Sequence, residues 1–166
     1  FEARWFLPGP PSSPVTIAGR RVGTLICEDL WDDGYDIHPP ADLLAAGAEV
    51  LIGISASPFR RGTLAQRLHV MRRPRCPLVY VNLVGANDEL IFDGRSLFLD
   101  RAGRPAAILP AFAEHVQTVD IQTEATANGY APQPLIESVY EALLLGIRDY
   151  ARKTGFRQAV LGLSGG

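Results

Sequence analysis

Short apolar runs separated by polar turns dominate the first two thirds of the chain. Three of them, at 22–26, 49–54 and 77–83, are rich in Val, Ile and Leu and too short for helices, so each predicts a buried strand. The run at 49–54 is continuous rather than alternating, which favours an inner strand covered on both faces. Segments with helical spacing, 39–46 and 63–73, lie between these strands. The order predicts an α/β sandwich in which helices cover a sheet.

Shorter strands complete the predicted sheet, and turn-forming residues separate them. The segment 15–18 forms a hairpin with the first buried strand across Gly19-Arg20. A last strand is predicted from the alternation of apolar and polar residues at 115–121. Another pair of strands is predicted at 96–100 and 105–109.

The apolar period changes after residue 121. The segment 122–133 has little apolar content and predicts a linker. An amphipathic helix follows, from Pro134 to a stop at Gly155, and then an apolar strand at 159–163. The apolar positions of the helix recur every four residues, at Leu135, Val139, Leu143 and Ile147. We therefore expect three parts, at 1–121, 122–133 and 134–166.

Cys27 stands at the carboxyl end of the strand 22–26, where open α/β folds present reactive groups on a rigid sheet. A buried, unreactive thiol is the alternative, because free cysteines are among the most buried residue types. The acids beside it, Glu28 and Asp29 first among them, disfavour the thiolate, so a reactive Cys27 needs a cation or a general base nearby. The only lysine, Lys153, lies far downstream.

Composition excludes several classes of protein. The chain has 166 residues, of which 47% are hydrophobic and 20% charged, as in an ordinary globular domain. A net charge of −2 gives no electrostatic footprint for nucleic acid. No membrane span and no leader peptide are indicated, so we expect a cytoplasmic protein without membrane partners. The short basic cluster is interpreted as a solvated helix face, and it comprises Arg67, Arg72, Arg73 and Arg75.

The two cysteines, Cys27 and Cys76, do not make a disulfide framework in a chain of this length. No Cys/His spacing fits zinc, and an EF-hand alignment of the aspartates puts Trp31 and Pro40 at ligand positions. We therefore expect reduced thiols and no metal site.

The residues around Cys27 carry a resemblance to a known family. The motif Gly-x-x-Ile-Cys-Glu-Asp-Leu-Trp, an alanine-rich helix and then Ile-Ser-Ala-Ser-Pro-Phe resemble the nucleophile region of the nitrilase superfamily. More narrowly, they are similar to the glutaminase domain of glutamine-dependent NAD synthetases. That resemblance implies a Glu-Lys-Cys triad that attacks the side-chain amide of glutamine, forms a thioester and releases ammonia.

The resemblance assigns roles to three residues. Cys27 matches the nucleophile, the backbone N–H of Glu28 matches part of the oxyanion site, and Ser57 matches a position that contacts glutamine. The family's lysine precedes its cysteine, so the triad is incomplete in this chain.

One substrate-binding candidate departs from the family. After Ser-Pro-x-x-x-Gly the family usually has Lys or Arg, a natural partner for the substrate's carboxylate, whereas this chain has Thr63. Either Arg60 or Arg61 substitutes for that cation, or glutamine binding is weaker.

The carboxyl end resembles the opening of the Ser-Gly-Gly-x-Asp-Ser loop of ATP pyrophosphatases, in which glycines let backbone N–H groups approach phosphates. Its x-Asp-Ser is absent, so no complete ATP site is expected. The alternative is a plain glycine turn after a strand. The ATP-binding candidates are Gly162, Ser164, Gly165 and Gly166.

Together the motifs imply a fragment: a partial nitrilase-like α-β-β-α sandwich, a linker, and the first helix and strand of a parallel α/β domain. The implied parent is a homo-oligomer that converts deamido-NAD to NAD with ATP, Mg²⁺ and ammonia from glutamine. The fragment alone is expected to bind no cofactor and to be inactive. Its first residue is not Met and its last are glycines, so both ends are expected to be cuts through a longer sequence.

Two other interpretations remain open. A free-standing nitrilase-type amidase would share the Cys27 region but lack the segment from Pro134 onward. A truncated, non-catalytic product would have the same sequence without the Glu and Lys upstream.

Overall fold

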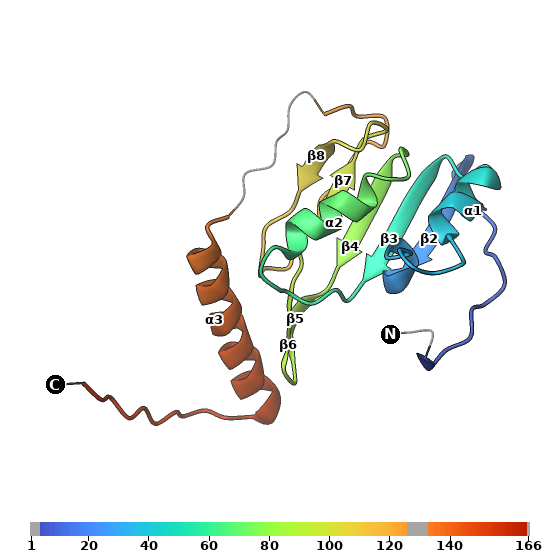
Figure 1. Cartoon of the computed structure of the whole chain (residues 1–166). Helices are drawn as coiled ribbons and strands as arrows, with labels where there is room; N and C mark the ends of the chain where they lie inside the picture. The colour runs from blue at the N-terminus through green and yellow to red at the C-terminus, as the bar shows by residue number, and fades with distance from the viewer. Residues whose placement is uncertain (1–3, 126–132, 166) are drawn as a thin grey trace.

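The computed structural model describes residues 4–125 and 133–165 (Figure 1). A six-stranded sheet forms its centre, in the order β1-β2-β3-β4-β7-β8. The inner strands β2, β3 and β4 are parallel, whereas β1, β7 and β8 pair antiparallel with their neighbours. The strands of this sheet are β1 (Val15–Ile17), β2 (Arg20–Ile26), β3 (Val50–Ser55), β4 (Leu78–Asn82), β7 (Leu97–Leu99) and β8 (Pro105–Ile108).

A separate antiparallel hairpin extends below the sheet in Figure 1 and consists of β5 (Val84–Asn87) and β6 (Leu90–Asp93). The helical elements are the 3-10 turn η2 (Cys27–Leu30) and the helices α1 (Pro39–Ala45), α2 (Thr63–Met71) and α3 (Leu135–Thr154). None of the helices among the described residues is long and apolar enough to cross a membrane.

One face of the sheet packs against α1 and α2, which lie in front of it in Figure 1. Leu51 of β3 is fully buried, and Leu43 of α1 and Leu68 of α2 belong to the same apolar cluster. Gly53 leaves room for Leu30 of η2, because a Cβ at position 53 would lie 2.7 Å from the Leu30 Cδ1. This contact holds η2 against the sheet.

The opposite face of the sheet is exposed at the carboxyl ends of β2, β3 and β4, although Phe98 of β7 is buried. Ile26, Ile54 and Val81 lie side by side across β2, β3 and β4, and their exposed fractions are 72%, 58% and 45%. The prediction that the strand at 49–54 is covered on both faces is therefore wrong for the part of the chain that the structure describes. A continuous apolar run predicts that both faces of a strand are covered, but it does not identify the segment that covers each face.

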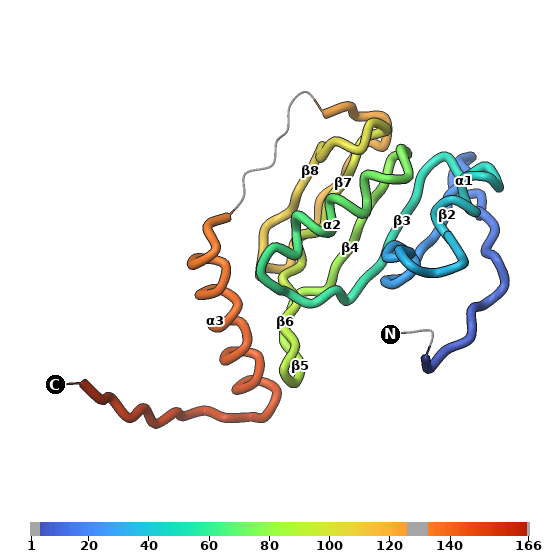
Figure 2. Tube along the Cα trace, viewed as in Figure 1, coloured from blue at the N-terminus to red at the C-terminus, as the bar shows by residue number. Residues whose placement is uncertain are grey.

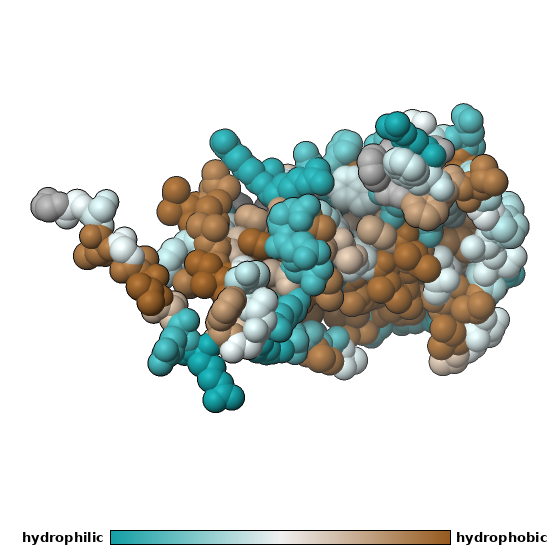
Figure 3. All heavy atoms as spheres, turned by 90° about the horizontal axis from the view of Figure 1, so that it is seen from below, coloured by the Kyte–Doolittle hydropathy of each residue, from teal (hydrophilic) through white to brown (hydrophobic). Residues whose placement is uncertain are grey.

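Helix α3 packs against the hairpin rather than the sheet, as the tube in Figure 2 shows. Ala142 and Leu145 are buried there, in a cluster that includes Phe112 and, partly buried, Ile91. Large apolar side chains elsewhere on α3, such as Ile136 and Ile147, remain exposed. The space-filling view in Figure 3 shows several apolar patches on one face of the molecule, separated by polar side chains.

The structure confirms most of the predicted elements. The first hairpin turns at Ala18-Gly19, one residue earlier than predicted, and both residues have positive φ, as a two-residue type I′ turn requires. The long helix ends before Gly155, whose φ of 79° is the left-handed conformation expected after a helix end.

Two predicted strands are wrong. The segments 115–121 and 159–163 are irregular, and Val116 and Val160 are almost fully exposed. A strand needs a neighbour for its N–H and C=O groups, and neither segment has one among the described residues. The domain limits at 121 and 133 remain a prediction, since most of the linker lies outside the described residues.

Candidate active site

Cys27 lies where β2 ends and η2 begins. Its φ is 44°, in the left-handed region that is unfavourable for a residue with a Cβ, so the chain turns abruptly at the thiol. The carboxylate of Asp29 accepts a hydrogen bond from the Ile26 N–H at 2.7 Å and holds this turn. The thiol is partly exposed, so the alternative of a fully buried cysteine does not hold for Cys27, although it describes Cys76.

A cavity of about 260 Å³ opens beside Cys27. Because β2 and β3 are parallel and pair Ile26 with Ile54, their carboxyl ends meet at one edge of the sheet. The loop after β3 therefore lies beside η2, and its Ser57 and Pro58 line the same cavity as Cys27. The cavity is lined by Cys27, Glu28, Trp31, Ser57, Pro58, Arg60, Thr63 and Gln66.

The sequence-predicted glutaminase residues thus come together. Cys27, Glu28, Ser57 and Thr63 all line the same cavity. The N–H of Glu28 lies in the first turn of η2, where a helix provides no internal acceptor, so it can donate to a developing oxyanion.

The acids near Cys27 are largely engaged in structure. The Arg73 guanidinium, just beyond α2, donates to the carboxylates of Asp32 and Asp33. The Asp32 carboxylate also lies 3.1 Å from the His38 ring. The Glu28 carboxylate accepts a hydrogen bond from the Tyr35 hydroxyl at 3.1 Å. Glu28 is the acid among the cavity-lining residues.

Thr63 lines the cavity, but its hydroxyl is already used. Its Oγ1 accepts from the Arg60 N–H at 2.8 Å and donates to the Arg60 carbonyl at 2.7 Å, and the residue is 6% exposed. The hydroxyl thereby fixes the backbone of Arg60, whose exposed side chain also lines the cavity. Arg61 is not among the lining residues.

A buried polar network supports the loop at Ser57. Arg67 is fully buried and forms a two-pronged ion pair with Asp93, with N–O distances of 3.1 and 2.9 Å. It also donates to the Ser57 carbonyl at 2.7 Å and to the Ser57 Oγ at 3.2 Å. The buried Asn82 accepts from the Ser57 N–H at 2.8 Å.

This network was not predicted from the sequence, and the interpretation of Arg67 as part of a solvated helix face is wrong, because its side chain is fully buried. The helical spacing held the signal, since position 67 falls on the same side of α2 as Leu64, Leu68 and Met71. A charged residue on an apolar face needs a buried partner, which Asp93 supplies.

Burial also sets the protonation of two groups near the core. Burial raises the pKa of the Tyr80 phenol, against the smaller opposing effects of the Arg67 charge and of the Ser55 and Ser57 hydroxyls. Burial likewise raises the pKa of the Cys76 thiol. Both groups therefore stay protonated near neutral pH.

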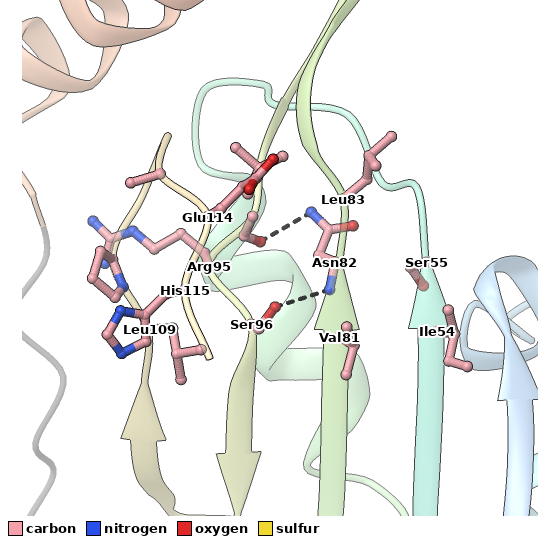
Figure 4. Close-up of a pocket in the computed structure, with 14 residues that line it drawn as sticks. Ile54, Ser55, Val81, Asn82, Leu83, Arg95, Ser96, Leu109, Glu114 and His115 are labelled. Atoms are coloured by element: carbon pink, nitrogen blue, oxygen red, sulfur yellow. Dashed lines mark hydrogen bonds between the residues drawn. The ribbon is translucent and has the colours of Figure 1, made fainter. Parts of the chain in front are cut away.

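A larger hollow of about 370 Å³ lies elsewhere on the structure (Figure 4). It includes Ile54 and Val81 of the exposed sheet face, and Cys27 is not among its lining residues. In Figure 4 the Asn82 side chain donates to the Gly94 carbonyl, and the Asn82 N–H donates to the Ser96 hydroxyl. Volume alone therefore does not identify the candidate active site.

The ATP-binding candidates are not assembled into a loop. Gly162, Ser164 and Gly165 lie in an irregular, exposed segment after α3, and Gly166 is outside the described residues. Their role remains a prediction. Within 4–125 and 133–165, no group of three or more His, Cys, Asp or Glu side chains could hold a metal ion.

A cysteine at the end of a parallel strand, beside a backbone N–H and a polar cavity, defines a class of site suited to nucleophilic attack on a carbonyl carbon. Residues 2–129 match the family described as Carbon-nitrogen hydrolase. The chain belongs to the carbon-nitrogen hydrolase family.

Several known proteins are similar to nearly the whole chain, beyond the residues 2–129 that match the family. The glutamine-dependent NAD(+) synthetase of Rhodobacter capsulatus is 42% identical over 99% of this chain and 31% of that protein. The structure of glutamine-dependent NAD+ synthetase from Acinetobacter baumannii with adenosine diphosphate has a TM-score of 0.77 and 26% identity, over 93% of this chain and 30% of that one. The chain spans about a third of the length of the curated relatives that it matches.

A carbon-nitrogen hydrolase from Helicobacter pylori G27 shares the fold over a smaller part. Its TM-score is 0.57 at 22% identity, over 66% of this chain and 44% of that one.

Proposed function

We propose that this chain is part of a glutamine-dependent NAD synthetase, here called the parent enzyme, and that its cavity at Cys27 releases ammonia from glutamine. The assembly of Cys27, Ser57 and Arg60 around one cavity carries this proposal. The synthetase of Rhodobacter capsulatus matches 99% of the chain in sequence, including α3; among solved structures, the Acinetobacter baumannii synthetase covers 93% of the chain and the Helicobacter pylori hydrolase 66%. That difference favours the synthetase over a free-standing amidase.

The chemistry follows from the cavity. The Cys27 thiolate attacks the side-chain amide carbon of glutamine, and the Glu28 N–H stabilises the oxyanion. Collapse breaks the C–N bond, the nitrogen takes a proton and leaves as ammonia, and a thioester remains. Water then hydrolyses the thioester, which gives glutamate and restores the thiol.

The proton transfers need an acid–base group that we place in the parent enzyme outside residues 1–166. Lys153 does not serve, because its Nζ donates to the Ala86 carbonyl where α3 meets the hairpin. A positioned acid–base group contributes about 10²–10⁴-fold to the rate, so the chain alone has little activity under this proposal.

Arg60 is the cation that we propose for the carboxylate of glutamine. It lines the cavity with an exposed side chain, and the Thr63 hydroxyl fixes its backbone. This arrangement supports Arg60 rather than Arg61 as the replacement for the family's Lys or Arg.

The remaining parts of the proposal concern the parent enzyme. Residues 1–121 belong to its glutaminase domain, 122–133 to a linker and 134–166 to the start of its synthetase domain. ATP, Mg²⁺ and deamido-NAD bind that second domain, with Gly162, Ser164, Gly165 and Gly166 beginning its ATP loop. The parent enzyme is a cytoplasmic homo-oligomer.

The test is Cys27→Ala in the parent enzyme. It should abolish NAD synthesis from glutamine and spare synthesis from added ammonium, because only the first route needs the thiol. Loss of both activities in a folded variant, or retention of both, would contradict the proposal.

A further inference from the structure

Every polar group of Ser57 is held by a buried partner. Its N–H donates to the Asn82 Oδ1 at 2.8 Å, and its carbonyl accepts from the Asn82 Nδ2 at 3.1 Å and from the Arg67 Nη2 at 2.7 Å. Its hydroxyl lies 3.2 Å from the Arg67 Nε. Ser57 also lines the cavity beside Cys27, so the network ends at the candidate active site.

Arg67 can act only as the donor in these hydrogen bonds. A guanidinium has donors only, so the Ser57 oxygen must accept from it. Asp93 fixes the plane of the guanidinium through both of its oxygens, and the side chains of the pair are 0% and 5% exposed. Arg67 therefore touches neither solvent nor substrate.

The direction of that bond sets what Ser57 can offer. A hydroxyl has one proton, and an oxygen that accepts from Arg67 keeps its proton for donation. The buried Tyr80 is a second neighbour, but its phenol stays protonated and donates to the Asn82 Oδ1 at 3.3 Å. The remaining direction for the Ser57 proton is toward an acceptor, either the phenol oxygen or a ligand in the cavity.

We propose that Arg67 is a positioning residue that presents the Ser57 hydroxyl to the substrate as a hydrogen-bond donor. The site then selects a substrate with an oxygen acceptor at this point and disfavours one that presents a donor. The inference rests on the proposed glutaminase function. It adds that Ser57 is the donor in its hydrogen bond to the substrate.

A double variant of the parent enzyme tests the proposal. Arg67→Met alone leaves the Asp93 carboxylate buried and unpaired, which endangers folding, whereas Arg67→Met with Asp93→Leu replaces both charges with apolar side chains. The Michaelis constant for glutamine should rise about tenfold, the loss expected for one hydrogen bond, with little change in kcat. Synthesis of NAD from ammonium should not change.

Combining the double variant with Ser57→Ala distinguishes a role of Arg67 in positioning Ser57 from a general role in stabilising the fold. Ser57→Ala should raise the Michaelis constant by a similar factor, and adding it to the double variant should cause no further rise, because both changes remove the same contact. Additive effects, or an unchanged Michaelis constant in the double variant, would overturn the proposal. An equal loss of ammonium-dependent synthesis would do so as well.

Arg67→Lys covers the case in which the double variant does not fold. Lysine keeps the charge opposite Asp93 but lacks the planar fork that reaches Asp93 and Ser57 together, so the same rise is expected. Normal glutamine use by Arg67→Lys would overturn the proposal. If Cys27→Ala abolishes glutamine use while the Arg67 variants behave as wild type, only the positioning role fails; if Cys27→Ala has no effect, the proposed function itself fails.

Discussion

Asp149 in α3 accepts a hydrogen bond from the backbone N–H of Ala86 in β5 at 2.9 Å, across 63 residues of sequence. Lys153, one turn further along α3, donates to the carbonyl of the same residue. The two side chains therefore bracket one residue of an edge strand and add a polar attachment to the apolar contacts of Ala142 and Leu145. Helix and hairpin are joined in a fixed register.

Asp149→Ala in the parent enzyme should loosen that attachment. A hydrogen bond to a charged group contributes roughly 1.5–3 kcal/mol, so hydrogen exchange of the Ala86 amide should accelerate about tenfold or more. Asp149→Asn, which keeps one acceptor oxygen, is the matched control and should retain most of the protection. Equal exchange in all three proteins would show that the apolar contacts alone hold α3.

Arg60→Ala should weaken glutamine binding. Loss of a charged hydrogen bond to the carboxylate predicts a rise of about ten- to a hundredfold in the Michaelis constant. Arg61→Ala removes the same charge one residue away and should have little effect, because Arg61 does not line the cavity. Steady-state kinetics of both variants decide the matter, and a larger effect at Arg61 would reverse the assignment.

Asp100 should make stability depend on pH. Burial pushes the pKa of its carboxyl up, but hydrogen bonds from the N–H groups of Arg104, Ala125 and Ala102 and from the Arg104 side chain outweigh burial and lower it overall. Because the folded-state pKa lies below the unfolded value of 3.8, the stabilisation is complete above that value and disappears as the pH falls through the folded-state pKa.

Asp100→Asn tests this dependence. The variant should be less stable by roughly 1–3 kcal/mol at pH 7, since an amide nitrogen then faces a buried donor. The difference from wild type should persist down to pH 3.8 and then shrink as the pH falls through the lower folded-state pKa, as followed by urea unfolding between pH 7 and pH 2. A difference that stayed constant over this range would show that ionisation of Asp100 is not involved.

Residues 1–166 expressed alone should self-associate. Ile26, Ile54 and Val81 form one exposed apolar row, and soluble monomers rarely expose apolar patches beyond a few hundred Å². Ile54→Thr should reduce association measured by light scattering, whereas Val116→Thr, at an isolated exposed position, should not. A stable wild-type monomer would contradict this expectation.

The position of Cys27 and of the loop after β3 could be predicted because both follow from local patterns. Apolar runs locate the strands, and parallel pairing brings their ends to one edge. The Arg67–Asp93 pair could not be predicted in the same way, since the partners lie 26 residues apart on different elements. Strand pairing is equally non-local: the run at 159–163 has strand composition, but no neighbouring strand among the described residues pairs with it.

The left-handed backbone of Cys27 has a consequence for natural selection. A residue with a Cβ costs about 1–2 kcal/mol in this conformation, and glycine avoids most of that cost. Selection for backbone stability would therefore favour glycine at position 27, and selection for the thiol opposes it. In a lineage that no longer required the sulfur, this position should be among the first to change.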